Sequence, residues 1–412
     1  MACSKIFTGY LPELTNEIIQ NFRKDFSTLH SCILVNRFWC RLAIPLLWED
    51  PFSIPSQNYR CIEIYLHFLN EDSKAKFNEY ENIKNLIPTN TLFNYPSFTK
   101  YLSLNSICSS VEKWVATLVN DNRENLERLV YKSLFEVLLE NEGNLHSFEF
   151  VMSRNGSSIC THFNNTMELI LQHPNFICNI KNLALHIFHD IFLQNTINII
   201  PFLKFLYSNC NSISSIVFHF RIYNVDNFSL IEKCLSQLII SQHNLKIISF
   251  IACSTILYKP FLSLKNSNCS DTLNTIIFDN KPDDINIYLL IENIGQTINY
   301  LTILMDASNK YNSIVLQNLG QVLPSKLEYL YLSLSFSNDF ETFLKNSQNT
   351  FIKKLLIRNM LKDDNKIVLF YIKEYIMRKK RVKYLAFSEF VPGYSYTEKE
   401  LFFLKDENIN RG

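Results

Sequence analysis

The six residues LEYLYL, residues 327–332, carry a pattern that returns along most of the chain: an aliphatic residue, two others, a large apolar residue, one other and a second large apolar residue. Copies occur from residue 145 onward and start 25 to 35 residues apart. Recurrence at such a period is typical of proteins built from stacked structural repeats. The nine copies are LHSFEF (145–150), IKNLAL (180–185), ISSIVF (213–218), LKIISF (245–250), LNTIIF (273–278), INYLTI (298–303), LEYLYL (327–332), IKKLLI (352–357) and VKYLAF (382–387).

Each copy is predicted to form a short β-strand. Successive side chains of a strand point to opposite faces, so the fourth and sixth positions should be buried while the third, fifth and seventh face outward. The gaps between copies hold helical segments such as FSLIEKCLSQLII (228–240) and KIVLFYIKEYIMRKK (366–380). One strand with one helix cannot cover its own apolar face, whereas stacked neighbours form a continuous core. The sequence therefore predicts an α/β solenoid with a curved parallel sheet and outer helices.

This pattern resembles the leucine-rich repeat of the longer, irregular kind. The resemblance covers roughly residues 145–390, and TKYLSL at 99–104 is a candidate outlying copy. At the ninth position, where the family prefers Asn or Cys, only Cys253 keeps the preference. The turn after each strand must therefore be satisfied in another way.

The first fifty residues predict three short helices. Pro12 is suited to the first turn of a helix, and that helix should carry an apolar stripe formed by Leu14, Ile18, Ile19 and Phe22. Asp25 and Ser27 are candidate caps of a second helix. A third helix should begin near Arg37 and be stopped by Pro45. So small a unit buries little of its own surface, which indicates that these apolar helices pack against something else.

The same residues resemble the F-box family over about residues 9–50. The match runs through Leu11-Pro12, Ile18 and Phe22, then Leu34-Val35-Asn36-Arg37, Trp39, Leu42-Ala43, Pro45 and Leu47-Trp48. The resemblance implies a three-helix module that docks on the Skp-type adaptor of a cullin-RING ubiquitin ligase. The residues that would bury against the adaptor, or order the helices that do, are Leu11, Pro12, Ile18, Leu34, Val35, Trp39, Leu47 and Trp48. The alternative is that the three helices only cap the rest of the protein.

Near its C-terminal end, the outward strand positions of the repeat array carry tyrosine and basic residues. These residues are Tyr300, Tyr329, Tyr331, Lys354, Arg358 and Tyr384. Tyrosine and arginine are favoured in protein interfaces because they combine a large contact area with hydrogen bonding. We predict that this set binds a protein substrate, with ordinary strand propensity as the alternative explanation.

Composition and motifs exclude several other classes. Forty basic and 39 acidic residues give a net charge of +1, which predicts no general attraction for nucleic acid or for an anionic membrane. The seven glycines form none of the common phosphate-binding or nucleophile-elbow motifs. The 11 cysteines contain no CxxC pair, and no stretch predicts a signal peptide or a membrane-spanning helix, so we expect an intracellular protein, cytoplasmic, nuclear or both.

Two further clusters were considered as sites. His186 and His189 of HIFHD would point to opposite faces of a strand, which argues against a metal site. The run RKKR, 378–381, fits a nuclear signal, but it also lies at a predicted helix end, where the helix dipole favours cations. We therefore expect no metal and no cofactor.

The expected organisation is an F-box at 9–50, a helical connector at 51–142, the repeat array at 143–390 and a tail at 391–412. The resemblances together imply a non-catalytic substrate-recognition subunit of an SCF-type ubiquitin ligase. The alternative is a repeat-based binding scaffold that acts outside a ligase. A third class, an enzyme with catalytic residues on the array's loops, is disfavoured because the glycine motifs are missing.

Overall fold

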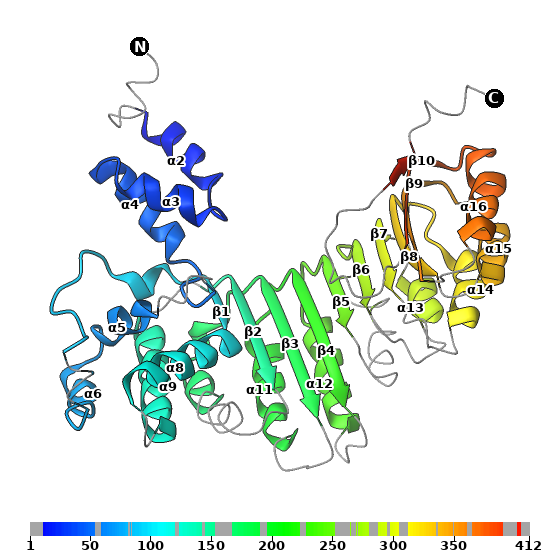
Figure 1. Ribbon diagram of the computed structural model, residues 1–412. Coiled ribbons are helices and arrows are strands. Elements are labelled where there is room, and N and C mark those ends of the chain that lie inside the picture. The colour runs from blue at the N-terminus through cyan, green and yellow to red at the C-terminus, as the bar shows by residue number, and fades with distance from the viewer. Residues whose placement is uncertain are drawn as a thin grey trace. The chain divides into compact units, whose positions relative to one another are not determined.

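The computed structural model describes most of the chain (Figure 1). The described residues are 11–53, 59–80, 83, 85–119, 123–141, 145–152, 167–189, 196–222, 228–251, 264, 269, 271–279, 287–294, 297–304, 312–334, 337–348, 350–360, 365–389 and 402–404. The chain divides into two compact units, residues 1–180 and residues 181–412.

The first unit is mainly helical. Its helices are α2 (Pro12–Gln20), α3 (Phe26–Ile33), α4 (Arg37–Leu47), α5 (Arg60–Leu66), α6 (Glu71–Ala75), α8 (Leu104–Leu118) and α9 (Arg123–Glu140), with short 3₁₀ turns at Tyr95–Phe98 and Pro174–Phe176. Strands β1 (Tyr101–Ser103) and β2 (Ser147–Met152) pair in parallel. The candidate copy at 99–104 therefore contains a strand, and its Tyr101 pairs with Ser147, the third position of the next copy.

The second unit alternates strands with helices. Its strands are β3 (Asn182–His189), β4 (Ser215–Ile222), β5 (Ile247–Ile251), β6 (Thr275–Asp279), β7 (Tyr300–Leu304), β8 (Tyr329–Leu334), β9 (Ile352–Asn359), β10 (Val382–Glu389) and β11 (Phe402–Leu404). Its helices are α11 (Thr196–Asn209), α12 (Phe228–Ile240), α13 (Ile287–Ile294), α14 (Asn312–Val322), α15 (Ser337–Asn346) and α16 (Asn365–Tyr371), which continues into a π-helical turn (Ile372–Met377).

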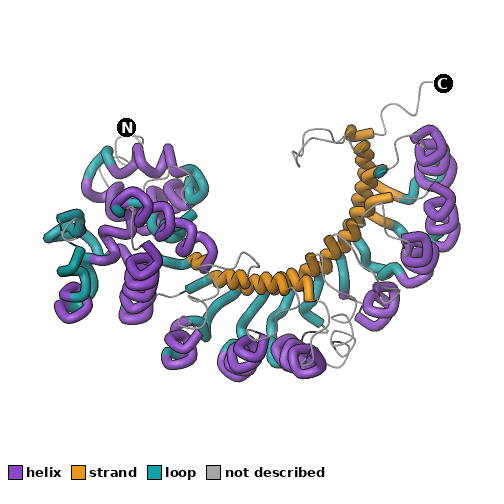
Figure 2. Tube along the Cα trace, turned by 60° about the horizontal axis from the view of Figure 1, so that its bottom comes forward, coloured by secondary structure: helices purple, strands orange, loops and turns teal. Residues whose placement is uncertain are grey.

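Strands β3 to β10 lie side by side in chain order, and each is parallel to the next. The helices of this unit cover one side of the curved sheet and leave its other side open (Figure 2). The predicted α/β repeat is thus confirmed at the level of strand, helix and parallel pairing. The region 391–412, expected as a tail, contributes β11, which pairs antiparallel to β10.

The strands pair in the same register from copy to copy. Tyr300, the third residue of its copy, pairs with the third residue of each neighbour, Thr275 and Tyr329. The fourth and sixth positions are buried in every copy, as predicted, and Leu330 and Leu332 are both 0% exposed. Phenylalanines at the sixth position stack along the array, with ring centroids of Phe250 and Phe278 separated by 5.3 Å.

Three outward positions differ from the prediction. Ser249 and Ala386 occupy fifth positions and Ser333 occupies a seventh position, yet all three are buried. Their side chains are small and do not project past those of the neighbouring strands, so the alternation of the strand is kept while the exposure is lost.

Backbone hydrogen bonds fix the entry to each strand. The carbonyl oxygen of Lys246 accepts from the amides of both Asn274 and Thr275, each at 3.0 Å. The carbonyl of Asn274 does the same for Asn299 (2.9 Å) and Tyr300 (3.0 Å). Cys253, the single residue that keeps the family's ninth position, lies outside the described residues.

Buried polar side chains also tie one repeat to the next. Gln242 is fully buried: its amide group donates to the carbonyls of Cys210 (2.7 Å) and Leu238 (2.8 Å), and its side-chain oxygen accepts from the amide of Ile213 (2.9 Å). These bonds join two successive turns between helix and strand.

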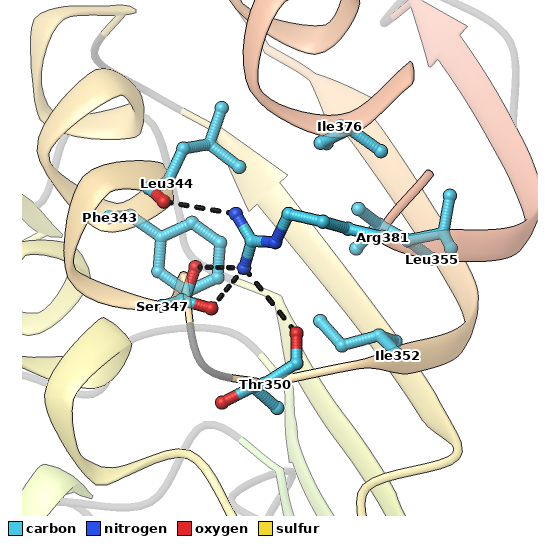
Figure 3. Close-up of a pocket in the computed structure, with 9 residues that line it drawn as sticks. Phe343, Leu344, Ser347, Thr350, Ile352, Leu355, Ile376 and Arg381 are labelled. Carbon is cyan, nitrogen blue, oxygen red and sulfur yellow. Dashed lines mark hydrogen bonds between the residues drawn. The ribbon is translucent and has the colours of Figure 1, made fainter. Parts of the chain in front are cut away.

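Arg381 is a second buried polar side chain that links one repeat to the next, near β9 and β10 (Figure 3). Its guanidinium donates to the carbonyls of Leu344 (3.1 Å) and Ser347 at the end of α15, and burial lowers its pKa. The small cavity around it is lined by Phe343, Ile352 and Ile376 among others. The RKKR run was expected to interact with the end of its own helix, whereas Arg381 donates to carbonyls at the end of α15. Arg378 pairs with Glu374 at 2.5 Å.

Candidate functional site

Helix α2 carries apolar side chains on two sides. Ile19 is buried in the core of the first three helices. Leu11, Leu14 and Ile18, at intervals of three and four residues, share a different side of the helix. Leu11 is 39% exposed, Leu14 is 42% exposed and Ile18 is half-buried. The predicted stripe is therefore unevenly buried: Ile19 lies in the core, Leu14 lies in solvent, and Phe22 packs against the core just after the end of α2.

A second exposed apolar pair lies in the turn between α3 and α4. Leu34 is 76% exposed and Val35 is 44% exposed. The turn is fixed, because the amides of Leu34 and Val35 bond to the carbonyls of Ser31 (3.1 Å) and Cys32 (3.2 Å). The Asn36 side chain then caps α4 by accepting from the Trp39 amide at 2.9 Å. Two apolar side chains are thus held in solvent by an ordered backbone.

The three helices have their own small core. Asp25 caps α3 by accepting from the Thr28 amide (3.0 Å) and hydroxyl (2.7 Å), and these bonds hold the pKa of Asp25 below its ordinary value. The buried core residues are Ile19, Leu29, Cys32, Trp39, Ala43 and Leu46, with Phe22, Ile33, Phe38, Leu42 and Leu47 packed against them. We call residues 11–50 the helical module.

The expected stop of the third helix at Pro45 is wrong, because α4 continues to Leu47. Proline removes one amide, the partner of the Arg41 carbonyl, and Arg41 is exposed, so water can take its place. The next turn is still closed by the Trp48 amide, which donates to the Ile44 carbonyl at 3.1 Å.

The eight residues predicted to bind an adaptor fall into two groups. Leu11, Pro12, Leu34 and Val35 are exposed, and Ile18 is half-buried at the edge of the same side of α2. The others take part in packing within the chain. Trp39 is buried in the module's core, Leu47 packs against that core, and Trp48 contacts Tyr65 (5.9 Å between ring centroids) and Tyr95 (4.3 Å).

Glu49 joins the helical module to the first strand. Its side chain is 3% exposed, and its carboxylate lies 2.6 Å from Lys100 Nζ and 3.1 Å from Arg23 Nε. Its backbone carbonyl accepts from the amides of Lys100 (2.9 Å) and Tyr101 (3.0 Å). This buried carboxylate therefore connects the end of α2, the end of α4 and β1. Sequence reasoning missed Glu49, because its partners lie 26 and 51 residues away.

The sheet face of the second unit brings four of the six predicted substrate residues into one row. Tyr300, Tyr329, Lys354 and Tyr384 are successive partners on β7, β8, β9 and β10. We call these four residues the tyrosine row. The rings of Tyr300 and Tyr329 are 6.1 Å apart, and burial raises the pKa of Tyr329. Tyr300 and Tyr384 are 43% and 47% exposed.

The other two predicted substrate residues lie further along the strands. Tyr331 pairs with Leu356 and is half-buried, and Arg358 pairs with Ser333 and Ser388. The charge of Arg358 acts on Asp279 of β6, where burial raises the carboxyl pKa and the guanidinium opposes that rise. Lys383, which the sequence did not single out, places its ammonium 5.4 Å from the centre of the Tyr384 ring.

The histidine cluster considered from sequence is arranged differently. His186 lies beside His219 on the next strand, with 3.3 Å between their Nδ1 atoms. Among the described residues, no group of three or more His, Cys, Asp or Glu side chains is placed to hold a metal ion. Within that same part of the chain, every helix is too short or too polar to cross a membrane.

No family model matches the sequence, and no curated protein matches it significantly.

Proposed function

We propose that the protein is the substrate-recognition subunit of an SCF-type ubiquitin ligase: residues 11–50 bind a Skp-type adaptor, and the sheet face of the second unit binds a protein substrate. The F-box-like order of residues supports the first part, and the tyrosine row, with Tyr300 and Tyr384 exposed, supports the second. The receptor performs no bond chemistry. It raises the local concentration of the substrate near a ligase held in the same assembly.

One observation carries the proposal. Leu34 and Val35 are held in water by the capped turn between α3 and α4, although the module has a core of its own. Burying a leucine side chain is worth about 1.5–3 kcal/mol. An ordered backbone that keeps such side chains exposed is typical of a surface that awaits a partner.

Coexpression with a Skp-type adaptor tests the proposal. The wild-type chain should copurify with the adaptor in equal amounts, whereas Leu34→Asp with Val35→Asp should leave the adaptor behind. Leu92→Asp is the matched control, because Leu92 is 89% exposed and lies outside the helical module. Retention of the adaptor by the Leu34/Val35 variant would contradict docking through this turn. Absence of any complex with the wild type would contradict the ligase proposal and favour a scaffold that acts outside a ligase.

A further inference from the structure

The tyrosine row ends in a pair of lysines that share one aromatic ring. The ammonium groups of Lys354 and Lys383 lie 5.9 Å and 5.4 Å from the centre of the Tyr384 ring. Both lysines and Tyr384 are exposed. Each cation is attracted to the ring, but the two cations repel each other. An anionic group bound beside Tyr384 would relieve that repulsion.

Within the described part of the chain, these two lysines have no carboxylate partner. Their basic neighbours are differently placed: Lys353 pairs with Glu328 at 3.4 Å, and the charge of Arg358 acts on Asp279. Lys354 and Lys383 therefore give the C-terminal end of the tyrosine row a positive charge that no carboxylate described in the structure pairs with. Two charges suit a short acidic segment, whereas proteins that bind nucleic acid commonly neutralise many phosphates, about six to ten in strong cases.

The other end of the row offers a different chemistry. Tyr300 and Tyr329 present a pair of neighbouring rings without a cation over them among the described residues. Such rings favour an apolar or aromatic side chain of a partner. Strands lie about 4.8 Å apart, so the pair on β7 and β8 is about 10 Å from the pair on β9 and β10. An extended peptide covers that distance in about three residues.

We infer that this face recognises an extended protein segment in which an apolar side chain is followed or preceded, about three residues away, by a pair of Asp or Glu residues. Tyr300 and Tyr329 hold the apolar side chain, and Lys354 and Lys383 bind the carboxylates beside Tyr384. The inference rests on the proposed function, because it names the substrate class for the same face.

Fluorescence anisotropy with synthetic peptides tests the inference. The probe is a fluorescein-labelled peptide with one Leu and a Glu-Glu pair three residues away, made in both chain orders. A matching peptide carries Gln-Gln in place of Glu-Glu. At low salt, the wild-type chain should bind one of the Glu peptides about tenfold or more tightly than its Gln counterpart, and salt should reduce the difference.

The variant Lys354→Ala with Lys383→Ala should lose that preference. The variant Lys366→Ala with Lys373→Ala removes the same charge from exposed positions of α16 and the π-helical turn, and it should keep the preference. Equal binding of the Glu and Gln peptides, an equal loss in both lysine variants, or tighter binding of a single-stranded oligonucleotide would overturn the inference. Adaptor copurification is measured on the same variants. Neither lysine pair lies in the helical module, so both variants should still bind the adaptor if the ligase proposal holds, even when the peptide inference fails.

Discussion

The carboxylate of Glu49 lies 2.6 Å from Lys100 Nζ, although the two residues are 51 positions apart and the Glu49 side chain is almost fully buried. Arg23 approaches the same carboxylate at 3.1 Å. This contact holds the end of α4 beside the start of β1, since the backbone carbonyl of Glu49 also accepts from the amides of Lys100 and Tyr101. Glu49 thereby fixes the helical module to the rest of the first unit.

Glu49→Gln should destabilise the first unit by about 1–2 kcal/mol, because it removes a buried charge and leaves two cations without it. The value lies below that of a fully buried pair, since Lys100 and Arg23 are 43% and 41% exposed. Urea unfolding followed by tryptophan fluorescence measures the effect. Glu71→Gln is the control: its pair with Lys74 is exposed, and its loss should cost less than about 0.5 kcal/mol. Equal effects would contradict the connecting role of Glu49.

Asn36→Ala should destabilise the helical module by about 1 kcal/mol, because the amide of Trp39 loses its capping oxygen. The same change loosens the turn that holds Leu34 and Val35, so adaptor affinity should fall as well. Asn36→Ser, which can still cap the helix, should restore both properties. If Asn36→Ala loses adaptor binding and Asn36→Ser does not restore it, the Asn36 side chain contacts the adaptor directly.

Asp50 should make stability depend on pH. Burial raises the pKa of its carboxyl, and Glu149 adds to the rise while Ser53 opposes it. The folded state therefore holds the proton more tightly than the unfolded state, so stability falls as the pH rises from about 4 through the raised pKa. Asp50→Asn should unfold at higher urea than wild type at pH 7, and the difference should shrink as the pH is lowered towards 4. A difference that grows on acidification would contradict this assignment.

Gln242→Ala should destabilise the second unit by about 2–3 kcal/mol, because it leaves the Ile213 amide and the Cys210 carbonyl buried without their partner. Gln317→Ala is the control: Gln317 also bonds to a neighbouring repeat, through Asp339 at 2.9 Å, but at an exposed site. It should cost less than about 0.5 kcal/mol. Similar unfolding midpoints for the two variants would show that Gln242 does not link the repeats.

The repeat architecture could be predicted because it is encoded in short stretches of neighbouring residues. Alternation at the fourth and sixth positions sets the buried side of each strand, and the recurrence of the same six residues sets the register. Tyr300, Tyr329, Lys354 and Tyr384 therefore fall into one row from their positions alone. The two N-terminal apolar pairs at Leu11-Pro12 and Leu34-Val35 are exposed at positions that sequence alone had singled out.

The remaining features depend on contacts between distant residues. Gln242, Arg381 and Glu49 act through partners about 30 to 50 residues away, and no short pattern marks them. The uneven burial of the apolar stripe on α2 was missed because Leu14, Ile18 and Phe22 are also compatible with one evenly buried stripe. His186 was compared with His189 on its own strand, whereas its neighbour in space is His219 on the next. Strand β11 has no copy of the repeat and pairs antiparallel, so the repeat pattern could not predict it.

Hydrogen-deuterium exchange of the purified chain, with and without a Skp-type adaptor, tests the central claim most directly. The proposal predicts that the adaptor slows exchange at the start of α2 and at residues 31–36, and that Leu34→Asp with Val35→Asp abolishes this protection. Unchanged exchange in both segments at saturating adaptor, or protection confined to other parts of the chain, would contradict it.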